Sequence, residues 1–283
     1  MTRFNIDPDL GWHLAIGNKF LEQGEIIRGD QFSWTMPGYF WGNSYFLYQI
    51  AVAFLFKNFS LILIGIFFSS LAGLATLMLL PKKLKFQTVL LVGLGVGIAT
   101  ANLAIRPHVF DFLFFSVLLV LLEKQLFRKK TFLPLWFFVF ALWANFHLGF
   151  LVGLVVLSAF ISIKSTQEFL ADKRLAVLVP GFLAIIAAFL GTFLTPFHFY
   201  IWKSIFLDTG GLTAWIYILE FLPVVLVTPL NIIYALSGLI FVYFFYKNFR
   251  RLDPAWFLIS AFIFMLPFLT VYFAFFGQPC SFL

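Results

Sequence analysis

The chain has 283 residues, of which 62% are hydrophobic and 11% are charged, and its mean hydropathy is +1.00. A soluble protein of this length has too little interior to hide so much apolar surface, so the composition excludes an ordinary water-soluble domain. The net charge of +7 does not indicate a nucleic-acid partner, because the basic residues lie in short loops between apolar stretches, as they do in membrane proteins.

The first 58 residues are expected to form a loop that carries two helices at a membrane surface. Apolar or small residues recur at helical spacings of four, three and four at Leu10, Leu14, Gly17 and Leu21. This period predicts an amphipathic helix over residues 10–24, with Gly24 as its stop. Residues 45–56 are an apolar run too short to cross a bilayer, so we expect a helix in the outer interface.

Eight apolar stretches follow, and each is expected to form a transmembrane helix, the shorter ones with help from their flanking loops. They are residues 59–80, 88–105, 109–122, 131–144, 148–163, 175–194, 221–246 and 254–276. The sequence therefore predicts an all-α fold, a polytopic transmembrane helical bundle of about eight spans. We expect one membrane domain over residues 1–283, with the loop of residues 1–58 outside and the spans in residues 59–283.

Charge sets the direction of these spans. Four alternate loops, at residues 81–87, 123–130, 164–174 and 247–253, hold thirteen basic and four acidic residues, and we place them in the cytoplasm. The rest of the chain holds six basic and eight acidic residues. Span 59–80 then starts outside, so the N-terminal loop is also outside. We expect a transmembrane helix before Met1 and a truncated C-terminus, which makes the chain a fragment.

The outer face carries the candidate catalytic residues, and the densest polar group there is Asp7, Asp9 and His13. Pro8 restricts the backbone between the two carboxylates, so both can point to one place. Such a pair can accept a proton from a hydroxyl group or hold a divalent cation. Asp9 also stands where it could cap the helix of residues 10–24, and Asp7 could be a solvated loop carboxylate.

Two short outer turns supply candidate substrate-binding residues. The first contains Arg106 and His108, and Asp111 follows on the same helical face. Arg106 could pair with a lipid phosphate or extend to lipid headgroups, and Asp111 could serve the site or pair with Arg106 or His108. The second turn contains Asn145 and His147, and His147 could be a general base, a hydrogen-bond donor or a structural residue.

The remaining outer segment, residues 195–220, mixes aromatic residues with His198, Lys203, Asp208 and Glu220. Its aromatic residues could anchor helix ends at the interface or line a groove for a sugar or a polyprenyl chain. The spacings of the four histidines match no compact metal motif, so we assign no metal ligand.

The N-terminal loop resembles the first extracytoplasmic loop of GT-C-type bacterial membrane glycosyltransferases. The matching positions are Asp7, Asp9, Trp12, His13, Leu14, Gly17, Asp30, Phe32, Ser33, Thr35, Trp41 and Asn43. Gly11 departs from the pattern, because it replaces the first Trp of the usual pair. Further along, RPHVF and NFHLGFLVG resemble the second and third outer turns of the same family, so the similarity extends through most of the chain.

The resemblance implies an enzyme of the cytoplasmic membrane that acts on its outer face. It implies a polyprenyl-phosphate-linked sugar as donor, with Asp9 and Asp7 as the base, Arg106 near the donor phosphate and Trp41 among the substrate-binding residues. A divalent cation is possible and not required by the sequence. Two alternatives stay open. One is a lipid-linked-sugar transporter, and the other is a non-catalytic homologue, with which the Gly11 departure and the apparent truncation are consistent.

Overall fold

The computed structural model describes residues 9–32, 34, 37–40, 42–80, 105–205 and 253–261, and the isolated short pieces 89, 92–93, 238–239, 242–243 and 246–247. Over these residues the protein is all-α. The extended pairing among them is a single bridge between Gly29 and Phe40. The chain divides into two compact units, Met1–Trp202 and Lys203–Leu283, and residues 254–261 of the second unit are helical.

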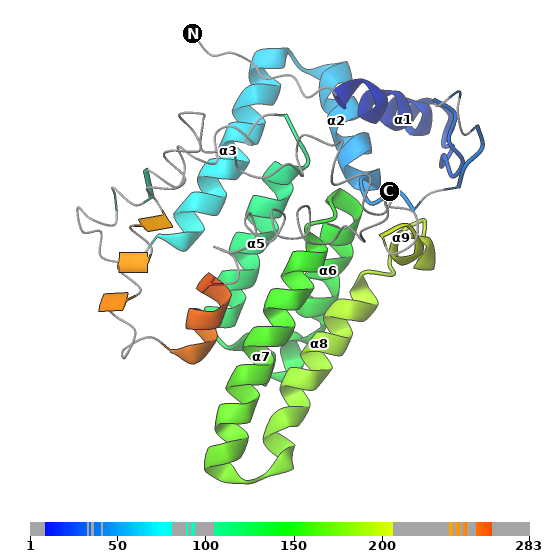
Figure 1. Ribbon diagram of the computed structural model, residues 1–283. Helices are drawn as coiled ribbons and strands as arrows, with labels where there is room; N and C mark the ends of the chain where they lie inside the picture. Colours follow the sequence, from blue (N-terminus) through cyan, green and yellow to red (C-terminus); the bar gives the residue numbers. More distant parts are fainter. Residues whose placement is uncertain are drawn as a thin grey trace, which may run out of the picture. The chain divides into compact units, whose positions relative to one another are not determined.

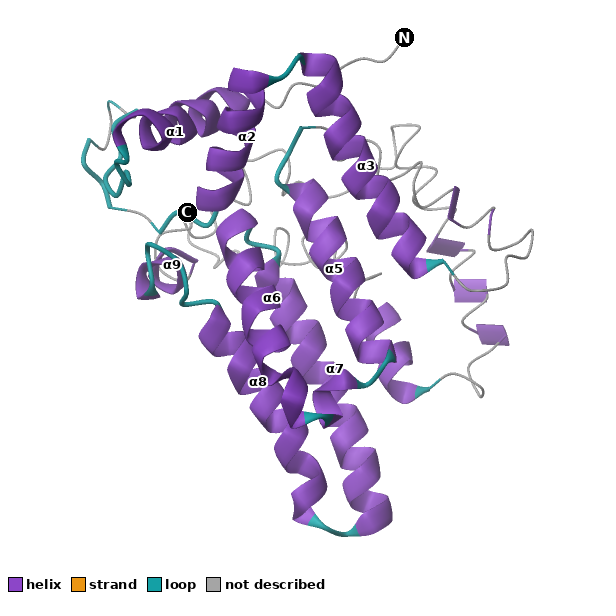
Figure 2. Ribbon diagram, turned by 180° about the vertical axis from the view of Figure 1, so that it is seen from behind, coloured by secondary structure: helices purple, strands orange, loops and turns teal. Residues whose placement is uncertain are grey.

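The helices of the first unit, with α9 at its boundary, are named in Figure 1. They are α1 (Leu10–Gln23), α2 (Phe46–Asn58), α3 (Leu61–Leu79), α5 (His108–Glu123), α6 (Leu133–Phe146), α7 (Phe150–Asp172), α8 (Val179–Gly191) and α9 (Phe199–Lys203). Short 3-10 turns at Leu126–Arg128, Lys130–Phe132 and Leu175–Leu178 connect some of them. Helices α5 to α8 run side by side, and α1 lies across one end of the group (Figures 1 and 2).

The two helices expected in the N-terminal loop are confirmed as helices. Helix α1 begins after Asp9 and ends at Gly24, whose φ of 69° is left-handed, a conformation that glycine adopts without steric cost. The buried face of α1 includes Leu10 and Gly17, as expected, but it also contains His13 and Ile16 in place of Leu14 and Leu21. The face is rotated because α1 packs closely on α2.

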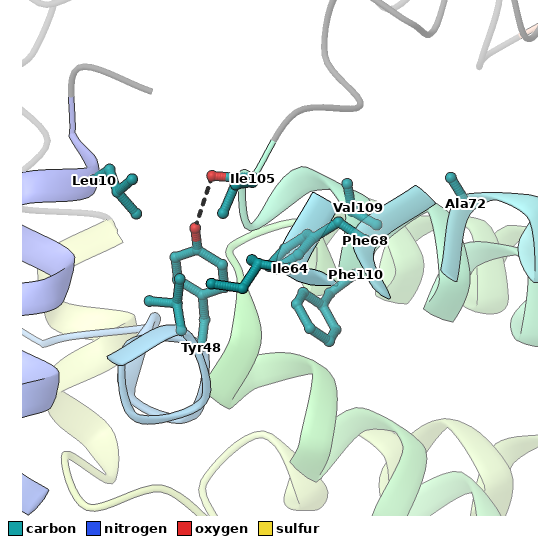
Figure 3. Packing of buried hydrophobic residues seen from close by; sticks show 9 residues of the cluster. Leu10, Tyr48, Ile64, Phe68, Ala72, Ile105, Val109 and Phe110 are labelled. Atoms are coloured by element: carbon teal, nitrogen blue, oxygen red, sulfur yellow. Dashed lines mark hydrogen bonds between the residues drawn. The ribbon is translucent and has the colours of Figure 1, made fainter. Parts of the chain in front are cut away.

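Gly17 permits that close packing. A Cβ atom at this position would lie 2.6 Å from the Cβ of Ala53 and would also collide with the backbone carbonyl of Gln49. A hydrophobic core then joins α1 and α2 to α3 and the start of α5 (Figure 3). Tyr48 lies in this core without any exposed surface, and its hydroxyl donates to the carbonyl oxygen of Ile105 at 3.1 Å. The N-terminal loop is therefore anchored to the turn before α5.

The expected spans that are fully described coincide with helices. The helix of span 148–163 extends well into its flanking loop, since α7 continues to Asp172 and places Lys164 inside the helix. The sequence after Lys164 contains no helix breaker, and α7 ends only where Lys173 adopts a left-handed φ of 57°. Most of the residues in spans 88–105, 221–246 and 254–276 lie outside the described part of the chain.

Two of the described helices, α3 and α7, are long and apolar enough to cross a membrane. The described part of the chain also holds shorter apolar helical segments at Phe46–Asn58, Lys130–Phe146 and Leu175–Gly191. Span length thus supports part of the expected bundle, and the number of eight spans remains a prediction.

Candidate functional site

Connections far apart in the sequence meet at one end of the first unit. Helix α1 crosses there, α5 begins there at His108, and the turn from α6 to α7 contains His147 (Figures 1 and 2). The rings of Phe110 and Phe146 stack with their centroids 4.3 Å apart, which holds the start of α5 against the end of α6. Four of the side chains expected at the outer face, His13, His108, Asp111 and His147, therefore lie in one region.

The centre of this region is a pair between Asp111 and His147. Oδ2 of Asp111 contacts Nδ1 of His147, and Oδ1 accepts a hydrogen bond from the indole nitrogen of Trp143 at 2.7 Å. Both oxygens of the carboxylate thus have a partner, which compensates for its partial burial. The side chains of Asp111 and His147 are 22% and 13% exposed, so the pair is still reached by solvent.

Gly149 shapes the same pair. A Cβ atom at residue 149 would overlap the carboxylate of Asp111, so only glycine allows the α6–α7 turn to pass this close. Its backbone nitrogen lies 3.4 Å from Nδ1 of His147, near the outer limit for a hydrogen bond. One ring nitrogen either accepts from the Gly149 N–H or donates to the Asp111 carboxylate, and the contact with the carboxylate is the closer of the two.

Aromatic contacts connect the pair to the N-terminal loop. The ring of His108 lies against that of His147, with centroids 4.5 Å apart. On the other side, the ring of Tyr45 lies 5.3 Å from His147 and 5.2 Å from His13. A continuous series of rings therefore runs from α1, through the segment before α2, to the α6–α7 turn.

His13 is buried in this series and is 2% exposed. Its Nδ1 lies 3.3 Å from the amide nitrogen of Gln49, whose oxygen accepts a hydrogen bond from Asn43 at 2.6 Å. Burial, and in second place the charge of His147, lowers the pKa of His13 from 6.5 to about 3. The imidazole of His13 is therefore neutral at neutral pH and accepts a hydrogen bond from Gln49.

The other expected site residues have varied positions. Asp9 is exposed at the start of α1, one turn before His13, and its side chain does not cap the helix. Arg106 is half-buried in the turn before α5. Asn145 is buried, and its amide nitrogen donates to the carbonyl oxygens of Ala141 and Leu194, which ties α6 to the segment after α8. Asp7 and Trp41 lie outside the described residues.

The tertiary structure adds residues that the sequence analysis did not single out. Trp143 and Gly149 contact Asp111, while Tyr45 and Gln49 contact His13. A sequence signal for Trp143 was its position four residues before His147, since in a continuing helix that spacing places two side chains on the same face. The helix instead ends at Phe146 and His147 is extended. No local spacing in the sequence indicates Tyr45 and Gln49, because they contact a residue that is more than thirty positions away.

The opposite end of α5 to α8 has a different composition. The connection from α5 to α6 contains Lys124, Arg128, Lys129 and Lys130, and the one from α7 to α8 contains Lys173 and Arg174. Arg128 and Glu168 form an ion pair that joins the first connection to α7. Basic side chains and the histidine–aspartate group thus lie at opposite ends of these helices, as the alternating loops predicted.

No three histidine, cysteine, aspartate or glutamate side chains among the described residues are close enough to hold a metal ion together. Asp7 lies outside the described residues and is not covered by this statement.

Comparison of the chain with known protein families, with curated proteins and with solved structures finds no match. Over the described residues the fold is all-α, with polar side chains among aromatic rings at one end of helices α5 to α8.

Proposed function

We propose that this protein is a membrane glycosyltransferase that moves a sugar from a polyprenyl-phosphate donor to an acceptor on the extracytoplasmic face of the cytoplasmic membrane. The observation that carries the proposal is that helix α1, the start of α5 and the α6–α7 turn bring His13, His108, Asp111 and His147 together. A reaction on a lipid-linked substrate needs polar and titratable side chains at the membrane surface, because the head group of the lipid lies there.

The surface of the helices supports a lipid environment. Ile62 and Leu77 on α3 are each 65% exposed and Phe182 on α8 is 63% exposed, whereas Gln49 and Thr192 are fully buried. Apolar side chains outside and polar side chains inside suit a protein surrounded by hydrocarbon, where backbone and side-chain polar groups must find partners within the protein. Membrane lipids are thus proposed partners along α3, α7 and α8.

The charge distribution supports the proposed orientation. Basic residues gather at the ends of α5 to α8 that lie away from His147, and basic loops remain in the cytoplasm. The histidine–aspartate group would then face the extracytoplasmic side, where the sugar of a flipped polyprenyl-phosphate lipid is available while its tail stays in the bilayer.

The proposed reaction is an inverting transfer by single displacement. The acceptor oxygen attacks the anomeric carbon and loses its proton to a base, for which Asp9 and Asp7 are the candidates that the sequence supplies. The bond from the anomeric carbon to the phosphate oxygen breaks at the same time, and Arg106 stabilises the negative charge that develops on the phosphate. His13 is too buried to meet either substrate and instead positions the segment around Tyr45.

The test is transfer by the purified protein of a radiolabelled sugar from polyprenyl phosphate to extracted envelope acceptors. Replacing both Asp7 and Asp9 by Asn should abolish transfer while expression and donor binding stay close to wild type. Glu22→Gln is the matched control, because Glu22 is an exposed carboxylate near the other end of α1 with only a weak contact to Lys57, at 4.0 Å. Full activity of the double variant would refute the roles given to the two aspartates.

A further inference from the structure

We propose that His147 is the proton acceptor of this site and that Asp111 and Trp143 are positioning residues that hold its ring in one tautomer. The inference rests on the proposed transfer reaction and changes one assignment in it. The base that takes the hydroxyl proton is His147, in place of Asp9 and Asp7, and the two aspartates are left to orient the acceptor.

The tautomer follows from the hydrogen bonds of Asp111. A carboxylate oxygen accepts hydrogen bonds, so in the proposed arrangement the Nδ1 atom that contacts Oδ2 of Asp111 donates and carries the hydrogen. The backbone N–H of Gly149, 3.4 Å from the same nitrogen, then makes no hydrogen bond to it. In the neutral ring the lone pair is then on Nε2. Nε2 has no hydrogen-bond partner among the described residues, since the polar contacts of His147 there are all made by Nδ1. This nitrogen can take a proton and, while the ring is neutral, cannot donate one to a phosphate.

Trp143 makes this arrangement sensitive to the charge of residue 111. Its indole N–H can only donate, and it donates to Oδ1 of Asp111. If residue 111 were asparagine, its single oxygen would turn toward Trp143 and its amide group toward His147. The histidine can adapt, because either of its ring nitrogens can carry the hydrogen, whereas the indole cannot. Asp111→Asn should therefore move the hydrogen of His147 from Nδ1 to Nε2.

The chemical consequence is specific. In the wild type, Nε2 of His147 accepts the proton of the acceptor hydroxyl while the acceptor oxygen bonds to the anomeric carbon and the phosphate leaves with the electron pair of the broken bond. The imidazolium that forms faces the Asp111 carboxylate, which offsets its charge. After transfer the proton passes to water. With the hydrogen moved to Nε2, that nitrogen has no lone pair to take the hydroxyl proton and this step fails.

The first test measures the tautomer directly by nitrogen-15 NMR of the full chain, labelled at histidine, in detergent at alkaline pH. His147→Gln assigns the resonances of residue 147 by their loss. Wild type and Trp143→Phe should both carry the hydrogen on Nδ1, because the carboxylate remains. Asp111→Asn should carry it on Nε2. Asp111→Asn with Trp143→Phe should return part of the hydrogen to Nδ1, because the amide is free to turn its oxygen to His147.

The second test measures transfer by the same proteins. Asp111→Asn and His147→Gln should each lower kcat by about 10²- to 10⁴-fold with little change in KM for the donor. The double variant Asp111→Asn with Trp143→Phe should have a kcat at least about tenfold higher than that of Asp111→Asn alone. A merely structural role for Asp111 predicts the opposite, because a second core substitution would lower activity further.

The outcomes separate this inference from the proposed function. Transfer by the wild type with an unaffected His147→Gln variant overturns the inference and leaves the glycosyltransferase proposal intact. An Asp111→Asn protein that keeps the hydrogen on Nδ1, or one whose activity Trp143→Phe does not recover, also overturns it. Absence of transfer by the wild-type protein overturns both.

Discussion

Acidification should destabilise the fold through His13, and the size of the effect follows from its burial. The folded pKa of His13 is lowered to about 3 from 6.5, first because the side chain is buried and second because His147 is near. Between these two pKa values the unfolded chain binds a proton at residue 13 that the folded protein excludes. Stability is therefore retained above pH 6.5 and lost as the pH falls toward 3.

The magnitude is about 1.4 kcal/mol for each pH unit below 6.5. The contribution of His13 to the free energy of unfolding should thus be lower by about 1.4 kcal/mol at pH 5.5 and by about 2 kcal/mol at pH 5, relative to pH 8. These losses are a large part of the total stability of a folded protein.

The assay is unfolding of the purified protein by SDS in mixed micelles at several pH values between 5 and 8. His13→Gln removes the titrating group, keeps a side chain that can accept from Gln49, and should flatten the pH dependence by the amounts above. His198→Gln is the control, because His198 is exposed, and it should keep the wild-type dependence. If the free energy of unfolding changes with pH equally in wild type and His13→Gln, the fold does not hold His13 neutral.

Further predictions concern close contacts and topology. Gly149→Ala should cost about 1–3 kcal/mol of stability because its methyl group meets the Asp111 carboxylate, and it should lower transfer as well. Gly17→Ala should be similarly destabilising at the crossing of α1 and α2, whereas Gly11→Ala in the same helix, with nothing within 4 Å, should stabilise by about 0.5–1 kcal/mol; equal thermal shifts of the two helix variants would contradict the packing. In a chain with Cys280 replaced by Ser, a cysteine at the exposed position 11 should react with a membrane-impermeant maleimide in intact cells. A cysteine at the exposed position of Lys129 should react only after lysis, and labelling of both from outside would exclude the proposed orientation.

Local sequence signals indicated the described helices and most of their ends. Leu10 to Gly24 showed a helical period closed by a glycine, and the apolar run after Ser60 became α3, whose first turn is capped by the Ser60 hydroxyl. Such signals depend on residues within a few positions of each other, so they can be read without knowing what the helix packs against. The segregation of basic loops from histidines could be read from the sequence for the same reason.

The partners of the polar side chains were decided only by the tertiary structure. The sequence offered Arg106 and His108 as partners for Asp111, but Asp111 pairs with His147, which is 36 residues away. His13 had been placed with the catalytic aspartates, yet the packing of α1 on α2 buries it against Gln49. Each helix face can meet several neighbours, and the choice among them depends on close contacts such as those at Gly17 and Gly149, which no local pattern specifies.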